Sequence, residues 1–361
     1  MVVNLDDYPK LKELDRHKML DALAELPEQC REAQRLGKKA ALSSVLPFMK
    51  EKEIAQIVVT GLGGSAIGGD LLRTYIADKV NIPVVVNRHY ELARFVGPRT
   101  LLFAVSYSGN TEETISAYRQ AKAKGAAVVV LTSGGALKEM ARQDNIPVIT
   151  VPTGFAPRAA LGYLFIPILV VLENLHLLNN QETEVNALVS HLKELSSQYK
   201  PEVPLAKNYA KLLAGQLHNR LPVIWGSSGT TEVAAQRWKG QINENAKTPA
   251  YWNVLPELNH NEIVGLEGPA ELLQRLYLII LSHPHDHPQV QKRISITKEL
   301  VAGVTAGVSE INASGTAELA RLFSLIYLGD YTSVYLAFLY GVDPGPVKVI
   351  DRLKKALREE K

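Results

Sequence analysis

Short apolar runs alternate with segments of helical periodicity along most of the chain. In the first half, the apolar runs cover residues 54–60, 83–86, 101–105, 127–131 and 148–151. A helical pattern or a short crossover separates each run from the next. This alternation is typical of a parallel β-sheet that is covered by helices on both faces. We therefore predict an α/β fold for this half of the chain.

The same order recurs in the second half. Apolar runs cover residues 221–225, 276–282 and 304–311, and helical patterns cover residues 316–328, 331–340 and 346–357. The chain thus resembles two copies of one doubly wound unit, each a mainly parallel sheet flanked by helices. We expect a first domain over residues 1–180 with a helical lead-in, a linker over 181–204, and a second domain over 205–361.

One apolar segment, residues 161–178, approaches the minimum length of a transmembrane helix. It contains Pro167, Glu173 and His176, and Arg158 lies just before it. We interpret it as a buried helix between two domains, and we expect no membrane partner.

Composition narrows the classes of partner and the compartment. The chain has 40 basic and 37 acidic residues, and no basic stripe stands out, so we do not expect it to bind nucleic acid. Its single cysteine, Cys30, cannot form an internal disulfide, and the N-terminus lacks the pattern of a signal peptide. We therefore expect a cytoplasmic protein.

A turn rich in hydroxyl groups follows the run 101–105 and precedes a helical pattern. Ser106, Ser108 and Thr111 crowd this turn, and Gly109 relaxes its backbone. The first amides of a helix lack intrahelical partners and carry partial positive charge, so such a turn suits a phosphate group. The alternative is an ordinary helix cap, with Ser108 or Asn110 as the capping residue and Glu113 closing a capping box.

A glycine-rich turn, GLGGSAIGG over residues 61–69, follows the run 54–60. It could indicate a dinucleotide site, and Arg88 could accommodate a 2′-phosphate. However, Ala66 stands where the third glycine of that pattern is expected, and Ser65 and the serine-rich second turn argue against this interpretation.

Several motifs together resemble a known family. The segments GLGGSAIGGDLL, SYSGNTEET and GSSGTTEVAAQRWKGQINENAK closely resemble the sugar isomerase (SIS) fold, a phosphosugar-binding domain. Together with GFAPR at 154–158 and ELNHNE at 257–262, their order is similar to that of the bifunctional phosphoglucose/phosphomannose isomerase family, which has tandem SIS domains. The resemblance covers roughly residues 20–357.

This resemblance implies an aldose–ketose isomerase that interconverts glucose 6-phosphate, and also mannose 6-phosphate, with fructose 6-phosphate through a cis-enediol(ate). It implies neither a cofactor nor a metal ion. Ser106, Ser108 and Thr111 match the family's phosphate site, and Gly64 and Ser65 match the turn that lines the sugar.

The resemblance also implies the catalytic groups. Glu244 matches the base that moves a proton between C2 and C1, and its surroundings make partial burial plausible. His260 matches the histidine that opens the sugar ring from the neighbouring subunit, so a homodimer is expected. Arg158 matches the arginine that binds the substrate and stabilises enediolate charge.

The family also uses a C-terminal lysine in ring opening. Lys354 fits the motif best, and Lys348 and Lys355 are the alternatives. Many relatives have threonine where Gly345 stands, near the C2 end of the sugar. The sequence therefore leaves the activity on mannose 6-phosphate less settled than that on glucose 6-phosphate.

Other functions remain as alternatives. A non-catalytic phosphosugar-binding regulator would keep the serine-rich turn but lack the pair Glu244 and His260, and an isomerase of another sugar phosphate is also compatible with the motifs. A glucosamine-6-phosphate synthase would need a nucleophilic cysteine near position 1, which Cys30 does not supply. The run HPHDHP at 283–288 has metal-ligand residue types, but we favour a loop and a helix start.

Overall fold

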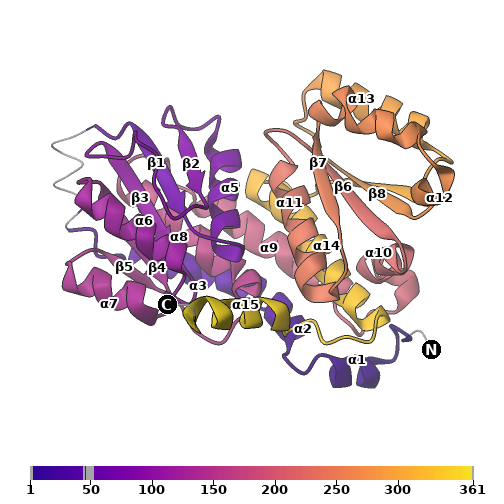
Figure 1. Ribbon diagram of the computed structural model, residues 1–361, viewed down its shortest axis with the longest axis horizontal. Coiled ribbons are helices and arrows are strands. Elements are labelled where there is room, and N and C mark those ends of the chain that lie inside the picture. The colour runs from indigo at the N-terminus through magenta and orange to yellow at the C-terminus, as the bar shows by residue number, and fades with distance from the viewer. Residues whose placement is uncertain (1–2, 44, 46–52, 360–361) are drawn as a thin grey trace. The chain divides into compact units, whose positions relative to one another are not determined.

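The computed structural model describes residues 3–43, 45 and 53–359, and it forms two compact units (Figure 1). The β1–β5 unit comprises residues 25–193 and 314–324. The β6–β9 unit comprises residues 1–24, 194–313 and 325–361. The N-terminal residues thus belong to the unit of the second sheet, and most of the expected linker 181–204 is helix α9 (Glu182–Tyr199).

The β1–β5 unit contains five parallel strands in the order β2-β1-β3-β4-β5. Their bounds are β1 Gln56–Thr60, β2 Val84–Asn87, β3 Thr100–Val105, β4 Ala127–Thr132 and β5 Val148–Thr150. Every residue of β3 and β4 is buried, as expected for central strands of a sheet that is covered on both faces. The strand order reverses between β1 and β3, and ligands of such sheets bind outside the carboxyl ends of the strands at this point.

The helices of this unit include α3, α5, α6, α7 and α8, at Leu26–Lys38, Gly64–Ile76, Glu112–Ala123, Gly135–Gln143 and Leu161–Asn174. A core cluster joins Val58, Leu102 and Val130 of the sheet to Ala117 and Tyr118 of α6. Helix α8 packs on α3 and α5. The apolar segment 161–178 is therefore mainly a core helix of this unit, with residues 161–172 buried.

The β6–β9 unit contains four parallel strands in the order β7-β6-β8-β9. Their bounds are β6 Leu221–Ser227, β7 Tyr251–Leu255, β8 Leu276–Ser282 and β9 Gly307–Asn312. Strand β7 was not predicted, because it is a short edge strand whose first two residues, Tyr251 and Trp252, are exposed. Both sheets confirm the predicted fold class, an α/β protein with two parallel sheets flanked by helices.

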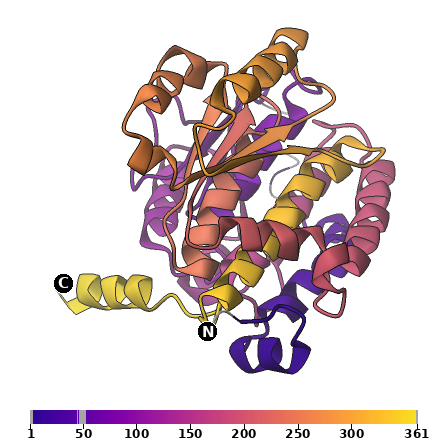
Figure 2. The ribbon, with the colours of Figure 1, turned by 90° about the vertical axis from the view of Figure 1, so that its right-hand side faces the viewer.

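The remaining helices are α1 Tyr8–Leu14, α2 Met19–Ala24, α10 Tyr209–Leu217, α11 Glu232–Gln241, α12 Ala270–Leu273, α13 Pro288–Val301, α14 Glu318–Leu339 and α15 Lys348–Glu359. Single-turn 3₁₀ segments lie at Pro157–Ala159 (η1), Leu205–Lys207 (η2) and Glu257–His260 (η4), a longer one lies at Glu262–Glu267 (η5), and a π-helical segment lies at Ile242–Ala246 (η3). Two separate helices were expected where the continuous helix α14 runs. Helix α15 extends away from the rest of its unit (Figure 2).

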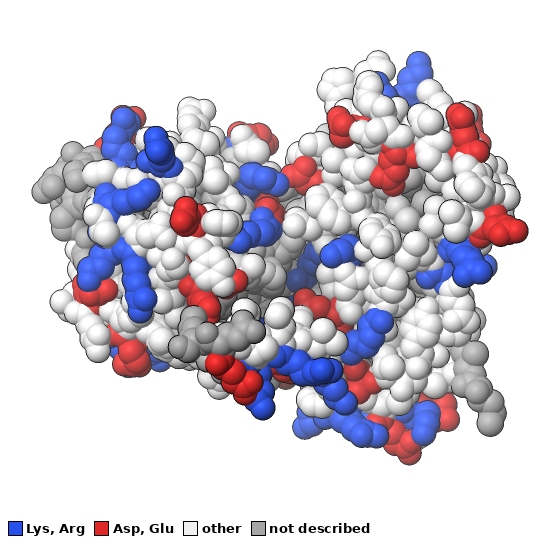
Figure 3. Space-filling model, in the orientation of Figure 1, with Lys and Arg blue, Asp and Glu red and all other residues white. Residues whose placement is uncertain are grey.

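Helix α14 is long and apolar enough to cross a membrane by length and composition, but 94% of its most apolar window is buried inside the protein. This burial is what a core helix of a folded domain shows. Over the face drawn in Figure 3, Lys and Arg side chains are interspersed with Asp and Glu.

Candidate functional site

Two turns of the β1–β5 unit meet at the carboxyl ends of neighbouring strands. Gly64 and Ser65 begin α5 directly after the turn that follows β1, and the turn after β3 contains Ser106, Ser108 and Thr111. Strands β1 and β3 pair directly, with Thr60 opposite Ala104. The structure therefore brings five of the six predicted substrate-binding residues, all except Arg158, to the point where the strand order reverses.

Hydrogen bonds among the hydroxyl groups organise the second turn. The Ser106 and Thr111 hydroxyls lie 2.9 Å apart, and the Ser106 Oγ also accepts from the Gly109 amide at 3.1 Å. The Ser108 Oγ accepts from the Asn110 amide at 3.3 Å. Gly109 has a φ of +69°, and a Cβ there would lie 1.7 Å from the Gly134 carbonyl oxygen, so only glycine fits this turn.

The capping alternative for this turn is wrong. Thr111 is the N-cap of α6, and its side chain makes no capping hydrogen bond. The Asn110 side chain accepts from the amide of Ala136, in the first turn of α7, rather than from α6, at 3.0 Å. The amino end of α6 thus combines backbone amides of partial positive charge with three nearby hydroxyls, which is the arrangement that binds a phosphate group.

The glycine-rich turn lies against the segment that carries Arg158. A Cβ on Gly64 would lie 2.8 Å from the Pro157 carbonyl oxygen and 3.1 Å from the Arg158 Cα, so a larger residue would push this segment away. Arg158 belongs to η1, and only 4% of its surface is exposed. The structure therefore places the backbone of Arg158 beside the glycine-rich turn.

Tyr107 is a residue of this site that the sequence did not single out. Its amide donates to the Ser65 Oγ at 3.3 Å, its hydroxyl donates to the Pro152 carbonyl at 2.9 Å, and that hydroxyl accepts from the Phe155 amide at 3.0 Å. Burial raises the pKa of the Tyr107 hydroxyl. Through its backbone amide and its side chain, Tyr107 thus ties both turns to the loop that leads to Arg158. No spacing rule for a serine-rich turn would have indicated this role.

The corresponding turn of the β6–β9 unit differs in charge. Between β6 and α11, the Gly229 amide and the Ser228 hydroxyl donate to the Glu232 carboxylate at 3.3 and 3.2 Å. The Thr230 hydroxyl donates to the Asp286 carboxylate, which comes from the loop after β8. Two carboxylates of the protein itself therefore take up donors of this turn, and their charge opposes the binding of an anion.

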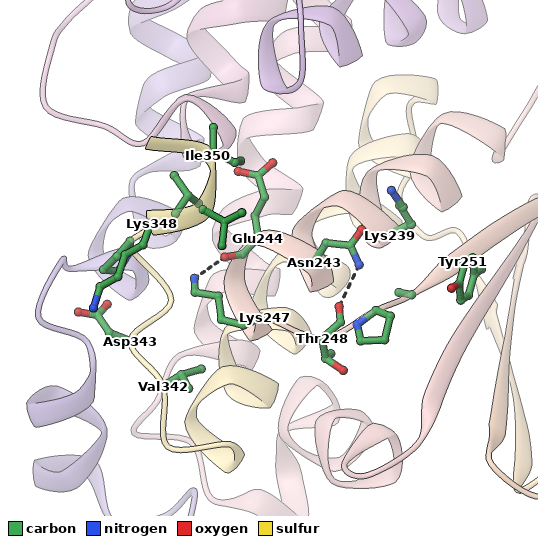
Figure 4. Close-up of a pocket in the computed structure, with 15 residues that line it drawn as sticks. Lys239, Asn243, Glu244, Lys247, Thr248, Tyr251, Val342, Asp343, Lys348 and Ile350 are labelled. Atoms are coloured by element: carbon green, nitrogen blue, oxygen red, sulfur yellow. Dashed lines mark hydrogen bonds between the residues drawn. The ribbon is translucent and has the colours of Figure 1, made fainter. Parts of the chain in front are cut away.

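Glu244 lies in the π-helical segment η3 that follows α11, and it is half-buried, as the sequence suggested. It lines a cavity of about 880 Å³ in the β6–β9 unit. Figure 4 shows residues from α11, η3, β7 and the start of α15 around this cavity. Segments of π-helix often occur at functional sites. The sequence predicted the carboxylate but not the irregular helix that presents it.

Lys348 rather than Lys354 reaches this cavity. Lys348 begins α15 and is one of the lining residues, together with Val349 and Ile350. Lys354 and Lys355 lie further along α15 and are exposed, and neither lines the cavity. In Figure 4 the Lys348 side chain points toward Asp343, while the Glu244 carboxylate points toward Ile350. The preference for Lys354 came from its motif, which carries no information on where α15 begins.

His260 is exposed at the end of η4 and does not line the Glu244 cavity of its own chain. Its loop is held by Glu262, whose carboxylate accepts from the Trp225 indole at 2.8 Å and from the Asn253 amide group. On the other side, Asn259 donates to Thr297 of α13 at 3.0 Å. A well-anchored loop therefore presents an exposed imidazole.

Two alternative readings can be compared with the contacts. His287 is the N-cap of α13, and its ring accepts from the Gln289 amide at 3.1 Å, which confirms the interpretation of residues 283–288 as a loop and a helix start. Arg88, considered above as a 2′-phosphate ligand, pairs with the buried carboxylate of Asp70.

Comparison with known proteins agrees with the two units. Residues 51–165 match the SIS domain family, and residues 206–357 match the family described as the bacterial phospho-glucose isomerase C-terminal SIS domain. Among solved structures, a glucose-6-phosphate isomerase like protein from Thermus thermophilus superposes with a TM-score of 0.64 at 22% identity, over 98% of this chain and 99% of that chain. At this identity the superposition supports the fold alone.

Two curated relatives carry the same description, "Bifunctional phosphoglucose/phosphomannose isomerase". The protein from Caldicellulosiruptor bescii is 52% identical over 343 residues, which cover 95% of this chain and 100% of the relative. The protein from Aquifex aeolicus is 36% identical, over 84% of this chain and 90% of the relative. With this identity over nearly the whole length, the chain belongs to the bifunctional phosphoglucose/phosphomannose isomerase family.

Proposed function

We propose that the protein interconverts glucose 6-phosphate and mannose 6-phosphate with fructose 6-phosphate, as the names of its relatives imply. The observation that carries this proposal is the uncapped amino end of α6, bordered by the hydroxyls of Ser106, Ser108 and Thr111. These groups would bind the phosphate that the three sugars share. Because that turn would contact only the phosphate, other residues of the site must discriminate between the sugars.

Glu244 would supply the acid–base chemistry. Isomerisation removes the C2 proton of the open-chain aldose and returns a proton at C1, so one carboxylate on one face of the cis-enediolate serves both steps. Support for this role comes from the half-burial of Glu244 in a cavity of about 880 Å³. A hydroxyl proton must also move, from O2 of the aldose to O1 of the ketose, so the net composition of the sugar is unchanged.

Arg158 would stabilise the negative charge that develops on the enediolate oxygens. Its guanidinium stays protonated at any working pH and offers a planar fork of donors. Its burial strengthens such an interaction, since the local dielectric constant is low. The backbone of its segment is fixed against Gly64, so the charge has a defined position.

Lys348 and His260 would act in opening the sugar ring. We assign the lysine of this step to Lys348, because it lines the cavity with Glu244. His260 is exposed and stands outside that cavity, which favours its action on the neighbouring subunit of a homodimer. An imidazole suits the step, because it exchanges protons near neutral pH.

We also propose a cytoplasmic location. The single cysteine, Cys30, is buried and cannot form an internal disulfide, which fits a reducing compartment. The substrates proposed here are small phosphorylated metabolites, and none of the groups assigned a role requires a metal ion.

The test is a coupled assay of the purified protein, after treatment with a metal chelator, on glucose 6-phosphate and mannose 6-phosphate separately. We expect turnover of both aldoses. Turnover of glucose 6-phosphate alone would restrict the proposal to one aldose. No turnover of either, with phosphosugar still bound, would replace it by the non-catalytic phosphosugar-binding regulator.

A further inference from the structure

His17 lies outside every motif discussed so far, yet it contacts the segment that forms one wall of the Glu244 cavity. Its ring Nδ1 lies 2.7 Å from the Asp343 carboxylate. Asp343 lines the cavity together with Val342 and Lys348. We call residues 342–348, which lead into α15, the C-terminal arm. His17, in the N-terminal lead-in, thus contacts this arm where it reaches the proposed active site.

The arm itself is held from two sides. The second oxygen of the Asp343 carboxylate accepts from the Gly345 amide at 2.9 Å, which closes a short loop just before α15. From the opposite side, the Lys247 ammonium donates to the Pro344 carbonyl at 2.9 Å and to the carbonyl of Glu244. The proposed base and the arm that carries Lys348 are therefore joined through one lysine.

Gly345 leaves no space for a side chain. A Cβ at this position would lie 2.3 Å from the His17 Cβ and 2.5 Å from the His17 Cγ. It would point at His17, and Gly345 is not among the described residues that line the cavity, whereas its neighbours Asp343 and Pro346 are. A side chain at position 345 would thus act on the site by displacing the arm.

Hydrogen bonds hold the backbone on both sides of His17. The Asp15 carboxylate accepts from the amides of Met19 and Leu20 at 2.7 and 2.9 Å, so it caps α2 directly after the turn that contains His17. The amide of Lys18 donates back to the Asp15 carbonyl at 3.0 Å. The imidazole therefore projects from a closed turn.

From these contacts we infer that His17 is a positioning residue for the isomerase reaction: its bond to Asp343 and its packing on Gly345 fix the arm 342–348 and hence Lys348 at the Glu244 cavity. This inference rests on the proposed function of that cavity. His17 touches no reacting atom in this scheme. We expect loss of His17 to lower kcat, because small displacements of a catalytic group slow the chemical step. KM should change little, because the proposed phosphate-binding turn belongs to the other unit.

The experiment compares His17→Ala with His17→Asn by steady-state kinetics on glucose 6-phosphate. We expect His17→Ala to lower kcat about tenfold with KM changed less than about threefold. His17→Asn should recover most of the loss, because the asparagine amide can donate from nearly the same place as the ring Nδ1. Lys10→Ala, in the exposed part of the same N-terminal segment, is the matched control and should leave both constants unchanged.

A double-mutant cycle tests the packing against Gly345. Gly345→Ala alone should lower kcat, and the same change in a His17→Gly background should have little further effect, because the clash between the two Cβ positions is then removed. Unchanged kinetics of His17→Ala, absence of recovery in His17→Asn, or additive effects in the cycle would each overturn the inference.

Failure of the inference and failure of the proposed function can be told apart. If Glu244→Gln retains full activity, the cavity is not the catalytic site and the proposed function of Glu244 fails. If Glu244→Gln is inactive and His17→Ala is fully active, only the role of His17 is refuted. Circular dichroism of each variant separates local misplacement of the arm from loss of the fold.

Discussion

The Ser65 hydroxyl oxygen accepts a hydrogen bond from the Tyr107 amide at 3.3 Å, and this contact joins two turns that lie about 40 residues apart in the chain. Ser65 follows β1 and Tyr107 follows β3, so the bond lies where the order of the strands reverses. The glycine-rich and serine-rich motifs are therefore two halves of one structure. Changes in either should alter phosphosugar binding.

Removing one hydroxyl of the second turn should weaken binding of the phosphate. We expect Ser108→Ala to raise KM for glucose 6-phosphate about tenfold or more, because a hydrogen bond to a charged group contributes about 1.5–3 kcal/mol, and to change kcat little. Ser228→Ala is the matched control, since Ser228 occupies the corresponding turn of the other unit and donates to Glu232. Equal effects of the two substitutions would refute the assignment of the phosphate to the first turn.

The Tyr107 hydroxyl should stabilise the fold up to high pH. Burial raises its pKa above the ordinary value of about 10, so the native state favours the protonated hydroxyl and keeps its bond to Pro152. We expect Tyr107→Phe to lower the free energy of unfolding by about 1 kcal/mol, constant between pH 6 and about 9.5. The difference should shrink only above pH 10, as deprotonation removes the donor. Denaturant unfolding at several pH values measures it, and a difference that vanishes near pH 8 would contradict this account.

Lys348 and Lys354 of α15 should behave differently. Lys348→Met should lower kcat about 10²-fold or more, because it removes a proton donor for ring opening, whereas Lys354→Met should be close to wild type. The assay should use the cyclic aldose as substrate, since ring opening precedes isomerisation. The reverse order of effects would restore the assignment to Lys354.

Two inactive variants should complement each other if His260 acts on the neighbouring subunit. Mixing Glu244→Gln with His260→Ala, followed by subunit exchange, would create hybrid dimers in which one site holds both native residues. About a quarter of wild-type activity is then expected in an equimolar mixture. Two variants that stay inactive after proven exchange would place His260 in the site of its own chain.

The sequence predicted the features that depend on local pattern. Period and composition located β1, β3 and α8 to within a few residues, because buried apolar runs bounded by turns are distinctive. The edge strand β7 was missed, since Tyr251 and Trp252 are exposed and the run is short. The residues 314–324 join the first unit through contacts distant in sequence, and no local signal reports them.

Among the site residues, too, the sequence predicted those that depend on local pattern and missed those that depend on contacts distant in the chain. Ser106, Ser108 and Thr111 were found from the sequence, because a hydroxyl cluster between a strand and a helix has a direct physical meaning. Tyr107 and His17 were not, since their roles depend on partners such as Pro152 and Asp343 that lie far away along the chain. Sequence spacing also cannot specify which lysine of an amphipathic helix faces a cavity.

The central claim is that Glu244 moves the proton between C2 and C1, and proton NMR in D₂O tests it directly. Wild-type protein incubated with fructose 6-phosphate should place deuterium at C2 of the aldose that forms and at C1 of the fructose 6-phosphate that re-forms, because the base can lose its proton to solvent between the two steps. In Glu244→Gln, the rates of exchange and of isomerisation should both fall by about 10²- to 10⁴-fold, while the variant still binds the sugar phosphate. Near-normal exchange in the Glu244→Gln variant would contradict the account, because another group would then be the base.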